Sequence, residues 1–184
     1  MQATSVLMEE HRIIERMLGD LETASARLAG GAPVRPGFFL DAAEFVKGFA
    51  DGCHHRKEEG VLFPAMEAAG VAREGGPIGV MLAEHEEGRR LTGAMRAAAE
   101  KLEAGSIAFR GEVVRNAQAY AALLRQHIAK EDTVLFPMAD RLLLPAARTK
   151  LAEDFERIEV EETGAGVHEK FLGMAQALAR EASG

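Results

Sequence analysis

The sequence predicts an all-α protein: an antiparallel up-down four-helix bundle with an additional C-terminal helical segment. Three observations predict this class. Apolar residues recur at helical spacing over long stretches. Gly- and Pro-rich segments separate these stretches, and no convincing alternating run indicates a β-strand. The length of 184 residues suits a single domain over residues 1–184, with a core bundle at about 5–144 and a C-terminal helical extension at about 146–182.

The helix boundaries follow from the breaks between the apolar stretches. Apolar residues from Val6 to Leu21 belong to the first helix, which ends at AGGAPVRPG (29–37). A turn at residues 105–106 separates the third helix from the fourth, and Pro145 ends the fourth. The second, third and fourth helices are expected at about 38–69, 78–104 and 109–144, and a fifth pattern runs to about 181, with a break near 163–166.

Composition and charge argue against several classes of partner. The net charge of −7 and the lack of a basic block disfavour nucleic acid. No apolar run reaches the ~20 residues that a membrane-spanning helix needs, so no membrane partner is expected. The N-terminal segment is charged and amphipathic rather than signal-like, which predicts a cytoplasmic protein. The single Cys53 excludes an intrachain disulfide and a cysteine-rich zinc site.

The chain contains an internal repeat. The segment HHRKEEGVLFP (54–64) aligns without a gap with HIAKEDTVLFP (127–137), at an offset of 73 residues. The segment VLMEEHRIIERML (6–18) aligns with VMLAEHEEGRRL (80–91), at an offset of 74 residues. A duplicated helical hairpin explains both alignments, because each copy then holds one early His and one later His-x-x-x-Glu.

The repeated residues predict a metal site in the centre of the bundle. Residues i and i+4 share one face of a helix, so His54 and Glu58 point together into the bundle. Buried imidazoles and carboxylates are costly unless a cation compensates them. Two cations, each with two imidazoles and both bridged by the carboxylates, meet this requirement, and this ligand type suits iron, zinc, copper or manganese. The six predicted ligands are His11, His54, Glu58, His85, His127 and Glu131.

Over about residues 5–140 the chain resembles the hemerythrin-like, His-His-Glu cation-binding family, through FADGCHHRKEEGVLFPAM (49–66), PIGVMLAEHEEGRRL (77–91) and HIAKEDTVLFP (127–137). The resemblance implies a four-helix bundle around two non-haem iron ions (Fe2+/Fe3+) with an oxo or hydroxo bridge, held by the same six residues. Zinc and manganese are the alternative metals. The resemblance also implies an open coordination position for a small-molecule partner: dioxygen, peroxide or nitric oxide.

The chain departs from the oxygen carriers of that family. Those carriers have a second His one turn after the third-helix ligand, where this chain has Arg89, so its centre starts with two imidazoles per metal. This difference argues against simple oxygen carriage. We expect His168 to supply the missing nitrogen by folding over the bundle; the alternative is a partly exposed His beside Glu169. His55 is about 100° around the helix from His54 and is expected to face a loop or solvent.

Other residues near the predicted ligands have structural assignments. Glu10 and Glu84 precede the early histidines and are expected to be solvated acids, with hydrogen bonds to the ligands or direct ligation as the alternatives. Pro64 and Pro137 follow the later ligands and are expected to kink or restart their helices.

The predicted function is that of a non-haem di-iron protein that binds or reacts with dioxygen, peroxide or nitric oxide. An enzyme of this kind would be a di-iron oxidoreductase acting on peroxide or oxygen. Two other classes stay open: an iron or redox sensor that acts through a protein partner, and a zinc-stabilised structural bundle. A ferritin-like iron oxidase is disfavoured, because those proteins use Glu-x-x-His, whereas the order here is His-x-x-x-Glu.

Overall fold

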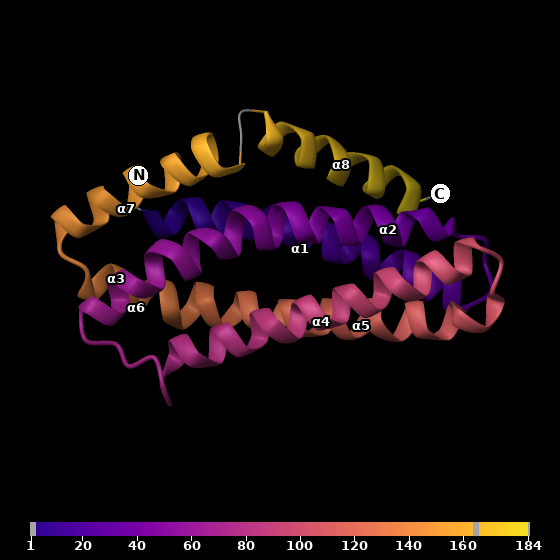
Figure 1. Cartoon of the computed structure of the whole chain (residues 1–184), viewed down its shortest axis with the longest axis horizontal. Coiled ribbons are helices and arrows are strands. Elements are labelled where there is room, and N and C mark those ends of the chain that lie inside the picture. Colours follow the sequence, from indigo (N-terminus) through magenta and orange to yellow (C-terminus); the bar gives the residue numbers. More distant parts are fainter. Residues whose placement is uncertain (1–2, 164–165, 184) are drawn as a thin grey trace.

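The computed structural model describes residues 3–163 and 166–183, and the regular elements in this part of the chain are all helices, which confirms the predicted all-α class. Four long helical stretches run along the long axis, and each runs opposite to the one before it (Figure 1). The first stretch is α1 (Ala3–Ala29) and the third is α4 (Pro77–Glu103). The second consists of α2 (Pro36–Phe45), η1 (Val46–His55), η2 (Glu58–Leu62) and α3 (Phe63–Ala68), and the fourth of η3 (Ile107–Phe109), α5 (Arg110–Lys130), η4 (Glu131–Leu135) and α6 (Phe136–Leu142).

The predicted Gly- and Pro-rich breaks lie between these stretches. Pro36 and Pro77 are the first residues of α2 and α4, where proline costs no helical hydrogen bond. Gly105 has a φ of 95°, a left-handed conformation that lets the chain leave α4 and turn back into η3. These short loops make neighbouring stretches antiparallel.

The helices next to the predicted ligands contain π-helical turns. A π turn has hydrogen bonds that span five residues instead of four. The π-helical elements η2 and η4 directly precede Phe63–Pro64 and Phe136–Pro137. Proline lacks the N–H that an α-helix needs and its ring crowds the preceding turn. The expected kink or restart therefore takes the form of a change from π- to α-helix just before each proline.

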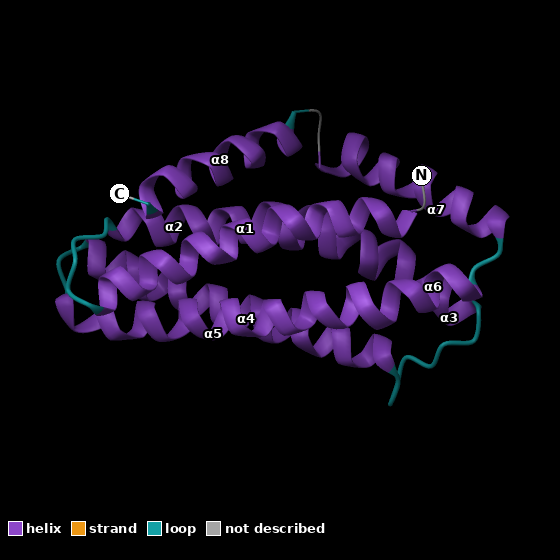
Figure 2. Cartoon of the chain, turned by 180° about the vertical axis from the view of Figure 1, so that it is seen from behind, coloured by secondary structure: helices purple, strands orange, loops and turns teal. Residues whose placement is uncertain are grey.

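The C-terminal part of the chain forms α7 (Pro145–Arg157), η5 (Ile158–Thr163) and α8 (Val167–Ala182), which lie over α1 and the second stretch (Figure 1 and Figure 2). Phe171 on α8 packs against Phe45 and Phe49, with ring centroids 6.1 and 6.4 Å away. The predicted break at 163–166 falls partly on residues 164–165, which lie outside the described residues.

The buried apolar side chains form two clusters along the bundle. The larger cluster includes Phe45, Met95 and Tyr120. The smaller cluster includes Phe63 and Phe136 from the repeated VLFP segments. On each of the four stretches, buried polar residues lie at the junction of the two clusters, so a polar layer crosses the middle of the bundle.

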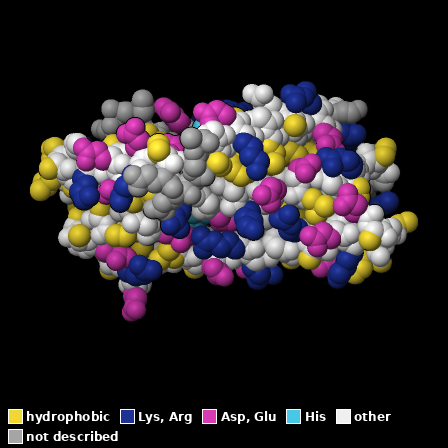
Figure 3. Space-filling view, turned by 45° about the horizontal axis from the view of Figure 1, so that its top comes forward, with side chains coloured by type: hydrophobic (Ala, Val, Ile, Leu, Met, Phe, Trp, Pro, Cys, Tyr) yellow, Lys and Arg dark blue, Asp and Glu magenta, His cyan; other side chains and the backbone are white. Residues whose placement is uncertain are grey.

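The surface is rich in charge. Lys, Arg, Asp and Glu side chains are interspersed on the face seen with α7 and α8 turned forward (Figure 3). Among the helices of residues 3–163 and 166–183, none combines the length and the apolar composition that a membrane span requires.

Candidate metal centre

Five imidazoles and two carboxylates meet in the polar layer between the two hydrophobic clusters. Each of these seven side chains belongs to a residue that is at most 3 % exposed. They form two groups that share Glu58, and in each group one ligand atom per residue lies within 4.8 Å of the others. Site A is the group of His11, His54, Glu58 and Glu131, and site B is the group of His55, Glu58, His85 and His127.

The two carboxylates lie between site A and site B. Glu58 directs Oε1 toward His54 Nε2 at 3.5 Å and Oε2 toward His85 Nε2 at 3.4 Å. Glu131 Oε2 lies 3.2 Å from the Nε2 atoms of both His11 and His127. Each carboxylate therefore faces one imidazole of either site, as a ligand that bridges two metal ions would.

The buried polar atoms in this layer fit a pair of cations. Among the described residues, no hydrogen-bond partner exists for the Nε2 atoms of His11, His54 and His55, or for either oxygen of Glu58 and Glu131. Such atoms are costly to bury unpaired, and neutral imidazole with carboxylate is a donor set that suits iron, zinc and manganese.

The pKa values of the two carboxyl groups also favour a cation in this layer. Burial, and then the charge of Glu131, raise the pKa of Glu58 well above the usual range of a glutamate. Burial would also raise the pKa of Glu131, but the imidazoles of His127 and His11 lower it. Since like charges in one buried layer disfavour each other, a cation in this layer would favour the ionised form of both carboxyl groups.

Every imidazole of the centre donates its Nδ1–H to a carboxylate. This arrangement fixes the ring and turns the Nε2 lone pair toward the centre, as outer carboxylates do behind metal-bound histidines. The Nδ1–oxygen distances are 2.7 Å for His11 to Asp132, 2.9 Å for His54 to Glu10, 2.9 Å for His55 to Asp51, 2.7 Å for His85 to Glu59 and 3.0 Å for His127 to Glu84.

A cationic side chain stands behind each of these outer carboxylates. Burial would raise the pKa of Glu59, but its hydrogen bonds with His85 and Arg89 hold it at about 2. Arg89 also lies 3.4 Å from Asp51, so one guanidinium supports two of the imidazoles of site B. The other pairs are Lys57 with Glu10, Lys130 with Glu84, and Arg12 with Asp132.

The sequence repeat relates most of this outer layer by an approximate two-fold symmetry. Glu10 holds His54 within the first copy, and Glu84 holds His127 within the second. Across the copies, Glu59 holds His85 and Asp132 holds His11. The symmetry ends at one pair: His55 and Asp51 align with the apolar residues Ile128 and Leu124 at the offset of 73.

The prediction that His55 faces a loop or solvent is wrong. His55 is 3 % exposed, and its ring stacks on the ring of His85 with centroids 3.8 Å apart. An angle of 100° does not prevent two neighbours from both being buried: His127 and Ile128, the repeat equivalents of His54 and His55, are adjacent on the α-helix α5, and each is 1 % exposed. In η1 (Val46–His55), which is π-helical, the angle between neighbouring residues is smaller still.

The structure does not bring His168 to the other six predicted ligands. Its Nδ1 lies 3.3 Å from Glu159, in a separate group with Glu10 and Cys53, and its side chain is 32 % exposed. The Lys57 ammonium contacts both Glu10 and Glu159 in that group, so a cation already pairs with these carboxylates. The third imidazole beside His85 and His127 comes from His55 instead.

The prediction that Glu10 and Glu84 are solvated acids is also wrong. Glu10 is buried, and both residues accept the Nδ1–H of a histidine, which was the alternative. Arg89 occupies the position of the absent third-helix His and supports the outer carboxylates. Asp51, Glu59 and Asp132 were not predicted, although Glu59 and Asp132 are acids at equivalent positions of the repeat.

Comparisons with known proteins agree with the donor set. The family model described as the Hemerythrin HHE cation binding domain matches residues 2–139. "Uncharacterized protein Rv1995" of Mycobacterium tuberculosis and "Uncharacterized protein Mb2018" of Mycobacterium bovis are each 28 % identical over 150 residues, which cover 82 % of this chain. The chain spans just over half, 58 %, of the length of these relatives. No solved structure matches. The matched region contains all seven side chains of site A and site B, and the chain belongs to the hemerythrin HHE cation-binding domain family.

Proposed function

We propose that the chain binds two iron ions, one at site A and one at site B, and that it binds dioxygen, peroxide or nitric oxide at this centre. One observation carries the proposal: five buried imidazoles divide into two and three around two carboxylates that face both sites. Iron held in this way supplies a redox-active Lewis acid that can accept a small ligand at an open coordination position.

The unequal division of imidazoles favours site A as the place of ligand binding. Site B offers the imidazoles of His55, His85 and His127, whereas site A offers only those of His11 and His54. If Glu131, which also faces His127, is counted at both sites together with Glu58, site A has four protein donors and site B has five, which would leave site A one more coordination position for an outside ligand. The fifth imidazole also removes the sequence-based argument against reversible binding, which rested on a centre with four.

The side chains around the centre are suited to keep water away from it. The ring of Phe136 stacks on His11 with centroids 5.3 Å apart, and the ring of Phe63 stacks on His85 at 6.0 Å. These two contacts are repeat equivalents and belong to the smaller hydrophobic cluster. An apolar cover of this kind favours a small neutral ligand over a charged or bulky one.

The test is metal analysis and optical spectroscopy of protein purified with and without air. The proposal expects two irons per chain and absorption bands that change when azide, peroxide or nitric oxide is added. Two zinc ions per chain, with no optical response to any of these ligands and no iron uptake by the metal-free protein, would overturn it.

A further inference from the structure

One face of the second helical stretch is buried, whereas the equivalent face in the second copy of the repeat is not. Three residues at intervals of four form this face, and each is at most 2 % exposed. They are Phe49, Cys53 and Lys57. Their equivalents at the offset of 73 are Ala122 and Gln126, which are exposed, and Lys130, whose side chain is 41 % exposed. A part of the chain outside the duplication therefore covers the first face.

The C-terminal part of the chain supplies this cover. The ring of His168 lies 5.4 Å from the ring of Phe49, and the ring of Phe171 lies 6.4 Å from it. A Cβ atom added to Gly48 would lie 1.8 Å from Phe171 Cζ, so the Phe171 ring fills space that any larger residue would occupy. The α8 helix is thus fitted closely to η1, although it lies beyond residue 139, where the family match ends.

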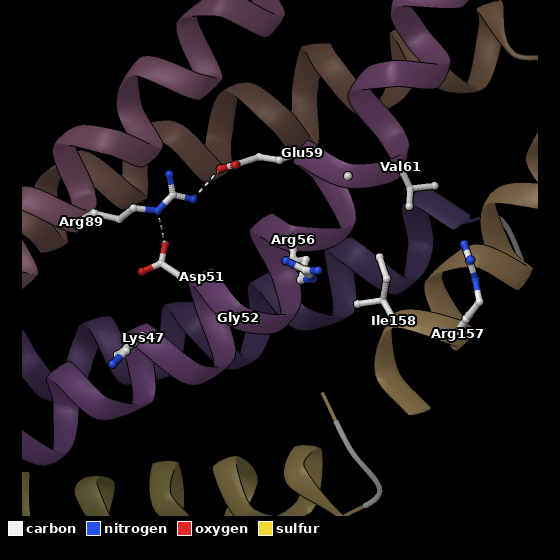
Figure 4. A pocket seen from close by; sticks show the side chains of 10 residues that line it. Lys47, Asp51, Gly52, Arg56, Glu59, Val61, Arg89, Arg157 and Ile158 are labelled. Atoms are coloured by element: carbon white, nitrogen blue, oxygen red, sulfur yellow. Dashed lines mark hydrogen bonds and ion pairs between the residues drawn. The ribbon is translucent and has the colours of Figure 1, made fainter. Parts of the chain in front are cut away.

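Glu159 on η5 brings a carboxylate to the far end of the covered face. Its Oε1 lies 3.4 Å from the ammonium of Lys57, a residue that is 0 % exposed. The preceding residue, Ile158, is 4 % exposed and lines a pocket together with Arg56 and Val61 of the second stretch (Figure 4). The η5 turn therefore lies against the same stretch, and this placement holds the Glu159 carboxylate beside Lys57.

A continuous line of contacts runs from Glu159 to site A. The Lys57 ammonium contacts Glu10 Oε1 as well as Glu159. The other oxygen of Glu10, Oε2, accepts the Nδ1–H of His54 at 2.9 Å. His54 is one of the two imidazoles of site A, so a residue of the C-terminal part lies three contacts away from the proposed iron.

The second copy has the same line of contacts without its last member. Lys130 contacts Glu84, which accepts the Nδ1–H of His127. Among the described side chains, Lys130 pairs with no second carboxylate. The carboxylate of Glu159 is therefore an addition to one half of the duplicated centre.

We propose that Glu159 is a positioning residue for site A, which acts through Lys57 and Glu10 on His54. This inference rests on the proposed function, because it assigns a role toward the iron of site A. An ammonium has three N–H donors, and here two carboxylates share them. Since Glu159 takes part of the charge of Lys57, Glu10 remains a stronger acceptor for the His54 Nδ1–H. A firmly held imidazole with a strong acceptor behind it is a better metal ligand.

The test compares Glu159→Gln with Glu156→Gln, the same change at an exposed residue of α7. Anaerobic chelator competition gives the ferrous iron affinity of both sites, and His11→Ala, which lacks an imidazole of site A, identifies that site. Glu159→Gln is expected to weaken site A about three- to tenfold, less than the roughly 10–100-fold typical of groups that touch a metal ligand directly. Site B is expected to keep its affinity in Glu159→Gln, and both sites are expected to do so in Glu156→Gln. Glu159→Asp, which retains the charge, is expected to restore most of the affinity of site A.

A second measurement follows the imidazole without any metal. In the metal-free chain with isotope-labelled histidine, the NMR signal of the His54 Nδ1–H is assigned by its change in Glu10→Gln. This signal is expected to shift in Glu159→Gln and to stay in place in Glu156→Gln. Weakening of both sites with an unchanged His54 signal would indicate a general loss of stability and would overturn the inference.

The outcomes separate this inference from the proposed function. Two irons bound with equal affinities in Glu159→Gln and Glu156→Gln overturn the role of Glu159 and leave the proposed function intact. An unaltered chain that binds no iron overturns both.

Discussion

The Nε2 atoms of His85 and His127 lie 3.1 Å apart, while their Nδ1 atoms are held by Glu59 and Glu84. With both Nδ1–H groups donating outward, two nitrogen lone pairs face each other in a buried layer. That arrangement is unfavourable unless a metal ion accepts both lone pairs or one nitrogen carries a proton that it donates to the other. The close approach of these two atoms therefore fits a metal ion at site B.

Removing the imidazole of His55 tests whether site B depends on the residue that breaks the repeat. We expect His55→Ala to lower the affinity of site B for iron by at least roughly 10–100-fold, the range seen when even outer-layer groups are lost. His168→Ala is the control and should retain two irons and an unchanged spectrum. Iron per chain after dialysis against a graded series of chelator concentrations measures both. Equal iron loss in the two variants contradicts the assignment of His55.

Glu10 and Glu84 provide a matched pair with different cations behind them. Glu10→Ala leaves Lys57, which is 0 % exposed, with the more distant Glu159 as its remaining carboxylate among the described side chains, and a charge that loses its buried partner costs about 3–5 kcal/mol. Both variants also remove the acceptor of a buried histidine Nδ1–H, but Glu84→Ala leaves Lys130, whose side chain is 41 % exposed, so we expect a smaller loss than in Glu10→Ala. Urea unfolding of the metal-free variants measures both losses. Similar values for the two variants would show that Lys57 is better solvated than its burial indicates.

Arg89 and Arg90 are neighbours on α4. Comparing variants of the two separates support of the metal centre from the effect of surface charge. Arg89→Met removes the cation behind Asp51 and Glu59, and we expect a fall of about tenfold in the iron affinity of site B. Arg90→Met removes a cation that pairs with Glu87 on the surface, and iron affinity should not change. Chelator competition followed by absorption gives both affinities. A smaller loss in Arg89→Met than in Arg90→Met contradicts the role of Arg89.

Metal removal should reduce the stability of the whole bundle. Without a cation, Glu58 and Glu131 share a buried layer in which burial and mutual repulsion raise the pKa of Glu58. A ligand that binds only the folded state adds about 4 kcal/mol when its free concentration is a thousandfold above its dissociation constant. We therefore expect a lower melting temperature after chelation, restored by added ferrous iron under anaerobic conditions. An unchanged melting temperature would mean that the centre binds metal weakly.

The repeat made the fold and the six shared residues predictable. Two segments at offsets of 73 and 74 imply a duplicated hairpin, and His-x-x-x-Glu at i and i+4 places both groups on one helix face. The outer carboxylates were harder to assign because an acid next to a buried His looks the same in sequence as a solvated acid. The repeated acids Glu59 and Asp132 carried a signal, since both copies keep an acid there.

The position of His55 does not follow from its angle to His54 alone. A helix that packs against several neighbours buries a wide face, so residues 100° apart are both buried, as His127 and Ile128 are on α5. One indication was present in the alignment: His55 matches Ile128, and Ile128 is 1 % exposed in the larger hydrophobic cluster. A polar residue whose repeat equivalent is a core residue is itself a candidate for the interior.

Site B has three imidazoles and site A has two, so the two proposed sites would bind iron in a fixed order. As iron becomes scarce, the better-provided site B would keep its ion after site A has released its own, so the chain would pass through a half-loaded form. That form has no second redox partner and could not exchange a pair of electrons with a ligand. A single histidine introduced into one half of a duplicated hairpin would thereby make the reactivity of the protein depend on iron supply.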